Sequence, residues 1–381
     1  MQTINEQYPA SVQLRRPIHV GVVGSGDMEI LISEPSTPGR ATVKVRTSVD
    51  GFDTVWRNVL ERFFHRHDLA GDFEINDFGA TPGMVTLRLA QAFELATMPE
   101  ANGGRDLDQM PFTELSARDR ARGILDPGTF REILGPFERL ESAHLEPQGI
   151  VPESDDGAVL ARGTIDGDPA VVAALEGKFQ GGGIGEVSGA KIAAALERAL
   201  VDAEAGIPIR VVLLLETGGI RLQEANLGLL AIAEIHSAIV ALQRHTPVVG
   251  VVAGMVGCFG GMGIAAGLCD RIIMTQEGRL GLNGPEVIET EAGVAELDST
   301  DRPAIWNMIG GRQRVATRRA DVLVEDQTAD VRRAVVEASA VTPTVHRANQ
   351  VDELLSQLAT VDPTIRLTAE DLRDITDRSH S

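Results

Sequence analysis

Two apolar runs, each followed by a glycine-rich turn, constrain the fold of this chain more than any other feature. Residues 211–215 and 248–253 hold only aliphatic side chains and glycine, and a stretch with helical periodicity lies between them at 223–243. A short apolar run without polar alternation indicates a strand covered on both faces, and such strands are typical of parallel sheets flanked by helices. We therefore expect an α/β domain whose ligands bind at the carboxyl ends of its strands.

The same alternation of strands and helices extends over most of the second half of the chain. We expect further strands at 158–165, 170–175 and 271–275, a helix at 186–204 after the glycine-rich loop 181–185, and a short helix that opens in the glycine cluster 257–261. Residues 112–150 show short helical patterns, among them 112–125 and 129–134. Their mixed polarity predicts an arm that lies on this domain.

The first hundred residues have a different pattern, with shorter strands that alternate apolar and polar side chains. We expect two strands joined at Ser25 within 17–33, further strands at 41–47 and 73–75, and helices at 53–65 and from residue 81 onward. This pattern predicts a small α+β domain with one sheet layer and one helix layer over residues 1–97. The polar, Gly- and Pro-punctuated residues 98–111 read as a linker to a second domain at 112–381.

Composition excludes several classes of partner. Lys and Arg number 35 against 55 Asp and Glu, which gives a net charge of −20, and aromatic residues make up 4%. We therefore expect neither nucleic acid nor an anionic membrane as a partner. The two cysteines, Cys258 and Cys269, are too few for a disulfide framework, and residues 1–16 lack the apolar core of a signal peptide. These observations predict a cytoplasmic protein.

One uncharged stretch, 246–269, is long enough to cross a bilayer. It contains seven glycines, and a strand, a turn and a buried helix explain that pattern better than a membrane span. We expect no span.

The glycine turns that follow the two apolar runs are candidates for chemistry. Glycine lets a substrate carbonyl approach the backbone closely, and N–H groups at a helix start carry partial positive charge. The N–H groups of Gly218, Gly219, Gly260 and Gly261 would together stabilise the enolate of a thioester. Close packing between strand and helix is the alternative explanation for the same glycines.

No acid–base or metal site is convincing in the sequence. The eight histidines are dispersed, and His236 and His245 lie in or just after a long helix, where solvated or capping roles are expected. We expect Cys258 to be buried and to pack as a small apolar side chain. Glu216, Glu224 and Lys191 lie near the proposed pocket in sequence, where charged side chains often only solvate the rim.

The amino-acid motifs around the glycine turns are specific to one superfamily. The chain reads "LLLETGGIRLQEANLGL" at 213–229, "FQGGGIGEVSGAKI" at 179–192, "GCFGGMGIAAGLCDRIIMT" at 257–275 and "GRLGLNGPEVIE" at 278–289. These segments resemble the carboxyltransferase superfamily, and most closely the β subunit of biotin-independent malonate decarboxylase over roughly residues 110–381. The resemblance implies a crotonase-like fold, decarboxylation of a malonyl thioester without a metal, an oxyanion hole at the four glycines named above, and cofactor binding by Gly182, Gly183, Gly185 and Lys191.

The N-terminal domain is similar to the acyl carrier (δ) subunit of the same enzyme. The likeness rests on "GVVGSGDMEILI" at 21–32, "VRTSVDGF" at 45–52 and "INDFGATPGMVTLRLAQAFE" at 75–94. Without it, Gly24-Ser25-Gly26 would read as an ordinary turn. The resemblance implies that Ser25 carries phosphoribosyl-dephospho-coenzyme A through a phosphodiester, attached by a transferase, and so presents malonyl and acetyl groups as thioesters.

The resemblance also implies a hetero-oligomer. A γ subunit would supply a second carboxyltransferase-like half, and an α subunit would exchange acetyl for malonate. The chain departs from the family by joining on one polypeptide two subunits that are usually separate.

Two other functions stay open. A carboxyltransferase of a biotin-dependent acyl-CoA carboxylase would need a biotin-bearing Ala-Met-Lys-Met motif. This chain lacks that motif, so a partner would have to supply it. A non-catalytic scaffold would carry the prosthetic group while a partner performs the chemistry.

Overall fold

The computed structural model describes residues 1–22, 24–98, 106–341, 347–362, 365 and 367–378. They form two compact units: Met1–Arg105 with Leu134–Asp156, and Asp106–Ile133 with Gly157–Ser381. Residues 99–105 of the predicted linker lie outside the described residues.

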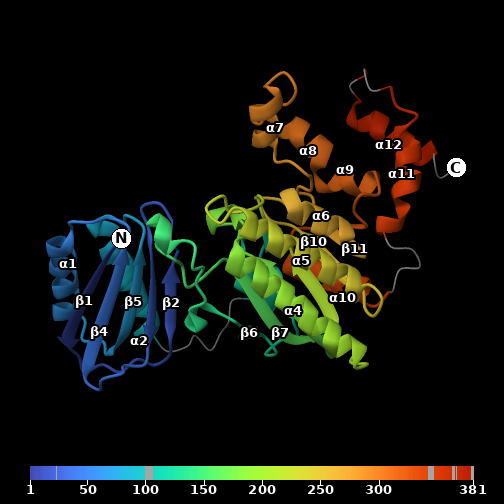
Figure 1. Ribbon diagram of the computed structural model, residues 1–381. Coiled ribbons are helices and arrows are strands. Elements are labelled where there is room, and N and C mark those ends of the chain that lie inside the picture. The colour runs from blue at the N-terminus through green and yellow to red at the C-terminus, as the bar shows by residue number, and fades with distance from the viewer. Residues whose placement is uncertain (23, 99–105, 342–346, 363–364, 366, 379–381) are drawn as a thin grey trace. The chain divides into compact units, whose positions relative to one another are not determined.

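The first unit is a five-stranded sheet with two helices on one face (Figure 1). Its strands run in the order β1-β4-β5-β3-β2. Their bounds are β1 (Gln2–Pro9), β2 (Ile18–Gly21), β3 (Met28–Ser33), β4 (Arg40–Thr47) and β5 (Gly71–Asp77), and the helices are α1 (Asp53–Arg66) and α2 (Pro82–Thr97). Only β4 and β5 run parallel, because α1 crosses between them.

Alternation along the strands creates the core of this unit. In β4 the side chains of Ala41, Val43 and Val45 are buried against α1 and α2, while the intervening residues face the other side of the sheet. The hairpin of β2 and β3 has its turn at Ser25, as predicted. The prediction lacked β1, which pairs along its whole length with β4 at the edge of the sheet.

Residues 134–156 belong to this unit and not to the second domain, so the predicted arm is wrong for that segment. A buried carboxylate explains the difference. Glu29 of β3 accepts hydrogen bonds from the N–H groups of Ser154 (3.0 Å, at Oε2) and Asp155 (2.8 Å, at Oε1), and the Asn76 side-chain amide also donates to Oε2 at 2.7 Å. Arg46 of β4 adds an ion pair with Glu141. The outer face of the sheet therefore holds the segment through polar contacts that sequence periodicity does not reveal.

The second unit is a seven-stranded sheet in the order β12-β11-β10-β9-β8-β7-β6. The strands are β6 (Arg131–Ile133), β7 (Ala158–Ile165), β8 (Asp168–Leu175), β9 (Arg210–Leu214), β10 (Val248–Val252), β11 (Arg271–Thr275) and β12 (Val322–Val324). From β8 to β12 all neighbours are parallel. The predicted parallel sheet is therefore confirmed for β8, β9, β10 and β11, and it also contains β12, which was not predicted.

Helices cover both faces of this sheet, and Figure 1 shows α4 and α5 crossing one of them. The helices of the whole unit are α3 (Ala117–Ile124), α4 (Glu186–Glu204), α5 (Asn226–Leu242), α6 (Gly260–Leu268), α7 (Pro285–Ala292), α8 (Arg302–Ile309), α9 (Gly311–Ala316), α10 (Thr328–Ser339), α11 (Val351–Leu358) and α12 (Ala369–Arg378). Val211 and Leu213 of β9 pack against α4 and α5, whereas Val212 and Leu214 pack against α3 and α10. This double burial explains the uninterrupted apolar run.

One prediction for this unit is wrong. Residues 131–133 form strand β6 rather than part of a helix, because they pair antiparallel with β7 at the sheet edge. Strands β7 and β8 also pair antiparallel, through a two-residue turn with positive φ at Asp166 (51°) and Gly167 (81°). Asp-Gly is a strong signal for such a hairpin.

The uncharged stretch 246–269 folds as β10, a turn and α6, as expected. None of the helices described above combines the length and apolar character that crossing a membrane requires.

Candidate functional site

Ser25 lies at an exposed turn with open space on both sides. The Asp27 N–H donates to the Gly24 carbonyl (2.8 Å), which closes a four-residue turn with Ser25 and Gly26 at its centre. Gly26 has a φ of 78°, a value that the third residue of such a turn adopts easily only as glycine. A Cβ atom added to Gly24 or Gly26 would meet nothing within 4 Å. The hydroxyl is therefore accessible to a large modifying enzyme.

An ion pair holds this turn in place. Arg88 of α2 donates to both carboxylate oxygens of Asp27, at 2.9 and 2.5 Å, and the Met28 N–H donates to the same carboxylate at 2.8 Å. Burial raises the pKa of the Asp27 carboxyl, but these hydrogen bonds outweigh burial and hold the pKa below its usual value. The residues that follow Ser25 are thus fixed to the helix layer while Ser25 itself stays exposed.

The two glycine turns of the second unit meet beyond the ends of β9 and β10. Thr217 donates its N–H to Gly257 (2.8 Å) and accepts from the Phe259 N–H (3.0 Å). A Cβ on Gly260 would lie 3.3 Å from the Cα of Gly219, and both glycines have positive φ, 61° and 135°. The structure therefore brings together the two turns that the sequence singled out.

Hydrogen bonds within the chain already use some of the predicted N–H donors. Gly218 donates to the Gly181 carbonyl (2.8 Å) and Gly260 to the Leu282 carbonyl (2.7 Å), while Gly219 donates to the Thr217 hydroxyl (3.1 Å). Within the described part of the chain, no acceptor is found for the N–H groups of Ile220 and Gly261. These two follow directly after the glycines that touch.

Sequence reasoning missed Ile220. It pairs with Ile184 in a short parallel bridge, in which the Gly219 carbonyl and the Arg221 N–H face Ile184. Because successive N–H groups along an extended chain point to opposite sides, the Ile220 N–H points away from Ile184. This alternation becomes visible only once the pairing is known.

Helix α5 packs against Gly261 and positions it. A Cβ on Gly261 would lie 2.7 Å from the Cγ2 of Ile232, and the Nε2 atom of His236 lies 2.8 Å from the Gly261 carbonyl oxygen. The partly buried His236 therefore contacts the glycine turn, a more specific role than the solvated or capping one expected.

The glycine-rich loop 181–185 packs against buried charged residues. A Cβ on Gly182 would lie 1.9 Å from the Glu216 carbonyl oxygen, and one on Gly185 would lie 2.4 Å from a Glu224 carboxylate oxygen. The N–H groups of Gly182, Gly183 and Gly185 donate to Phe179 (2.8 Å), Gln180 (3.2 Å) and the Ser188 hydroxyl (2.9 Å), respectively. These glycines serve packing here; their predicted contact with a cofactor stays a prediction.

The charged residues expected at the rim are buried instead. Lys191, Glu216 and Glu224 are each at most 6% exposed. Lys191 donates from Nζ to the Ala158 carbonyl (2.9 Å), Glu216 pairs with Arg120, and Glu224 pairs with Arg221 at 3.2 Å. Burial of these groups follows from tertiary contacts between distant segments.

Adjacent glycines in this loop provide a test of the packing role. We expect Gly182→Ala to lower the free energy of unfolding by about 1–3 kcal/mol more than Gly181→Ala, because only the first adds a methyl group against backbone. Both glycines have φ near 65° (65° and 68°), so the strain of a left-handed alanine is common to both variants. Urea unfolding followed by Trp306 fluorescence in a Trp56→Phe background measures the second unit. Equal losses would contradict the packing role.

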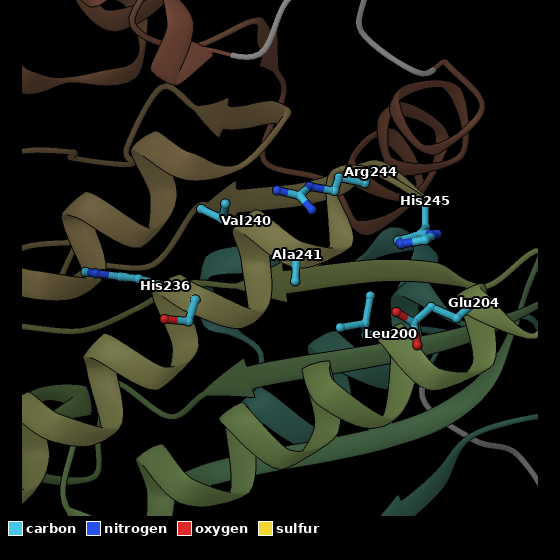
Figure 2. A pocket seen from close by; sticks show the side chains of 8 residues that line it. Leu200, Glu204, His236, Val240, Ala241, Arg244 and His245 are labelled. Atoms are coloured by element: carbon cyan, nitrogen blue, oxygen red, sulfur yellow. The ribbon is translucent and has the colours of Figure 1, made fainter.

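A cavity of about 460 Å³ lies along the C-terminal halves of α4 and α5. Figure 2 shows Glu204 and His245 near one end of it and His236 at the other. Arg244 also lines it, so its charge is mixed. None of the four predicted oxyanion glycines lines this cavity.

Neither a metal site nor a reactive thiol is evident among the described residues. No group of three or more His, Cys, Asp or Glu side chains is placed to hold a metal ion. Cys258 and Cys269 are fully buried, as predicted for Cys258, and burial raises the pKa of both thiols, that of Cys269 to about 12.

Comparison with known families agrees with the two units. Residues 15–96 match the family described as malonate decarboxylase delta subunit, and residues 108–376 match the carboxyl transferase domain. The malonyl-S-ACP:biotin-protein carboxyltransferase of Malonomonas rubra is 38% identical over 288 residues, which is 71% of this chain and 89% of the relative. The chain belongs to the malonate decarboxylase family. It combines an acyl carrier domain with a crotonase-like carboxyltransferase domain, and it is an enzyme component.

Further relatives match each part of this malonate decarboxylase component. The malonate decarboxylase acyl carrier protein of Pseudomonas fluorescens is 46% identical over 95 residues, 25% of this chain and 95% of the relative. A crystal structure of a Pseudomonas malonate decarboxylase hetero-tetramer in complex with malonate contains a chain with 57% identity and a TM-score of 0.69, covering 71% of this chain and 99% of that chain. An acyl carrier domain of this kind implies a prosthetic group on a serine, and relatives that form hetero-oligomers imply partner subunits.

Proposed function

We propose that this chain carries malonyl and acetyl groups as thioesters on Ser25 and decarboxylates the malonyl thioester in its second unit. One observation carries the proposal: the glycine turns after β9 and β10 touch at Gly219 and Gly260 and leave two N–H groups beside them without an acceptor in the described chain.

Ser25 is the proposed attachment point of phosphoribosyl-dephospho-coenzyme A. The fit is favourable because the hydroxyl is exposed and its two glycine neighbours leave open space for a phosphodiester and for a prosthetic-group transferase. The group would supply a thiol on a long arm, to which the acyl group is bonded. The ion pair between Asp27 and Arg88 anchors the turn from which the arm would leave.

The N–H groups of Ile220 and Gly261 are the proposed donors to the thioester oxygen. As the bond to the carboxylate carbon breaks, its electron pair moves toward the thioester and carbon dioxide leaves. Negative charge then develops on the oxygen, and donors already in place stabilise it. In this proposal neither a metal nor biotin takes part.

Replacing single backbone amides by esters tests this assignment. An ester at Ile220 or Gly261, made by incorporating the corresponding hydroxy acid, removes one N–H and leaves the side chain unchanged. We expect a loss of about 10²–10³-fold in decarboxylation of a malonyl thioester. The same change at Leu222, which is 83% exposed, is the matched control and should have no effect. Undiminished turnover by both ester variants would contradict the donors and favour a scaffold role.

We further propose a γ subunit as the partner of the second unit, an α subunit that exchanges acetyl for malonate, and a cytoplasmic location. Apolar side chains on α5 support a partner, since Leu229 and Leu230 are 51% and 59% exposed. An apolar helix face of this kind is typical of a surface that another chain covers.

Transfer of the carboxyl group to a biotin protein is a second candidate, because a relative 38% identical to this chain has that activity in its name. The two candidates differ in where the carboxyl group goes. Inhibition of malonate turnover by avidin would favour the biotin route. Turnover that is unchanged by avidin would favour direct release of carbon dioxide.

A further inference from the structure

The carrier unit contains an apolar cavity of about 330 Å³ that the proposed reaction does not use. It opens between the N-terminal ends of α1 and α2 and the ends of β4 and β5. Its lining is mostly aliphatic or aromatic and includes Val49, Phe52, Val55, Trp56 and Val85. Phe52 and Val55 are 50% and 38% exposed, so large apolar groups reach solvent at its rim.

This cavity lies next to the Ser25 turn. Phe78 accepts from the Gly26 N–H (2.9 Å) and donates to the Asp27 carbonyl (3.1 Å), and its chain neighbours Asp77 and Gly79 line the cavity. Standard bond lengths then place the Cα of Ser25 no more than about 10 Å from that of Gly79. A pantetheine-type arm that leaves Ser25 is longer than this and can fold back into the cavity.

The charge of the lining selects among acyl groups. No cationic side chain is found among the described residues that line the cavity, and its one charged group is Asp77, which is 2% exposed. Asp77 accepts from the Thr47 hydroxyl (2.6 Å) and the Ala80 N–H (2.8 Å). Burial raises the pKa of its carboxyl above the usual value. A second carboxylate brought here would lose water without gaining a partner, which is strongly unfavourable.

We propose that this cavity holds the arm when it ends in a free thiol or an acetyl thioester, and rejects it when it ends in malonyl. The inference rests on the proposed attachment at Ser25. Sorting by charge would keep the malonyl thioester in solvent, free to reach a decarboxylation site, and would shelter the product thioester from water.

Protection of the thioester from hydroxylamine, measured on the intact chain, tests this proposal. The arm is loaded with acetyl or malonyl in the absence of partner subunits, and cleavage by hydroxylamine is followed by mass spectrometry. That method tracks the malonyl form separately from any acetyl form that arises from it. Rates are divided by those of free acetyl- and malonyl-pantetheine. We expect about tenfold protection for acetyl, which corresponds to burial of roughly 60 Å² of apolar surface, and none for malonyl.

A matched pair of variants locates the protection. Val55→Trp places an indole in the cavity and should remove the protection, whereas Leu87→Trp adds the same indole at a 61% exposed site of α2 outside the lining and should preserve it. Trp56 fluorescence in a Trp306→Phe background should also change between the acetyl and malonyl forms, since Trp56 lines the cavity.

The outcomes separate this inference from the proposed function. A Ser25 peptide without any attached group in active enzyme would overturn the carrier role itself. An attached arm whose acetyl and malonyl forms are cleaved at the free-compound rates, or protection unchanged by Val55→Trp, would overturn the cavity assignment alone.

Discussion

Ser25→Ala is expected to abolish turnover of free malonate and to change the free energy of unfolding by no more than about 0.5 kcal/mol. The serine is exposed at the centre of its turn, and the bonds that hold the turn come from Gly24, Gly26 and Asp27. Removing the hydroxyl removes the proposed attachment point without removing a structural contact. Malonate turnover with all partner subunits present is the measurement, together with peptide mass spectrometry around Ser25.

Two controls sharpen the result. Ser36→Ala changes an exposed serine in another turn of the same unit and should leave turnover unchanged. The Ser25 variant should still decarboxylate malonyl-coenzyme A in solution, at roughly millimolar substrate, because a short tether provides a local concentration of that order. Full malonate turnover by Ser25→Ala would contradict attachment at Ser25 and leave residues 24–27 as an ordinary turn.

Arg120→Ala should produce the largest loss of stability, about 3–5 kcal/mol, because it leaves the buried Glu216 carboxylate without its cation. Arg120 is 5% exposed; it pairs with Glu216 and also donates to the carbonyls of Phe112 (2.8 Å) and Thr113 (2.7 Å). A Cβ on Gly254 would lie 2.0 Å from the Glu216 carboxyl carbon, so the buried carboxylate packs directly against Gly254.

Urea unfolding followed by Trp306 fluorescence in the Trp56→Phe background measures this loss. Arg333→Ala is the control, since its pair with Asp330 is exposed and should contribute only about 0.3–0.5 kcal/mol. Replacing both members of the buried pair with apolar residues should restore much of the stability lost in Arg120→Ala. A loss as small as that of the control would mean that the pair is solvated in the native protein.

Local periodicity accounts for the parts of the fold that were predicted well. Helix α4 and strands β7 and β11 have the predicted bounds, and the hairpin around Ser25 was also found. One face of α4 and of the hairpin meets the core, and both faces of β7 and β11 do, so the distribution of apolar residues carries the information. Strand β1 gave no such signal, because it lies at a sheet edge with most of its side chains exposed or half-buried.

Only part of the candidate site could be predicted from the sequence. The position of Ser25 and of the two glycine turns came from motifs, because glycine at those positions meets a backbone requirement that is local. Which N–H groups remain available could not be predicted. Gly218 and Gly260 donate to Gly181 and Leu282, residues more than twenty positions away in the chain.

The sequence alone therefore determined the two folded units, the class of each sheet and the candidate residues, since these depend on composition and on patterns within one element. Tertiary structure decided three other features: the pairing of β6 and β7, the placement of residues 134–156, and the burial of Glu216 beside Arg120. All three depend on polar groups that find partners far along the chain. A polar residue in a sequence does not reveal whether water or a distant partner will satisfy it.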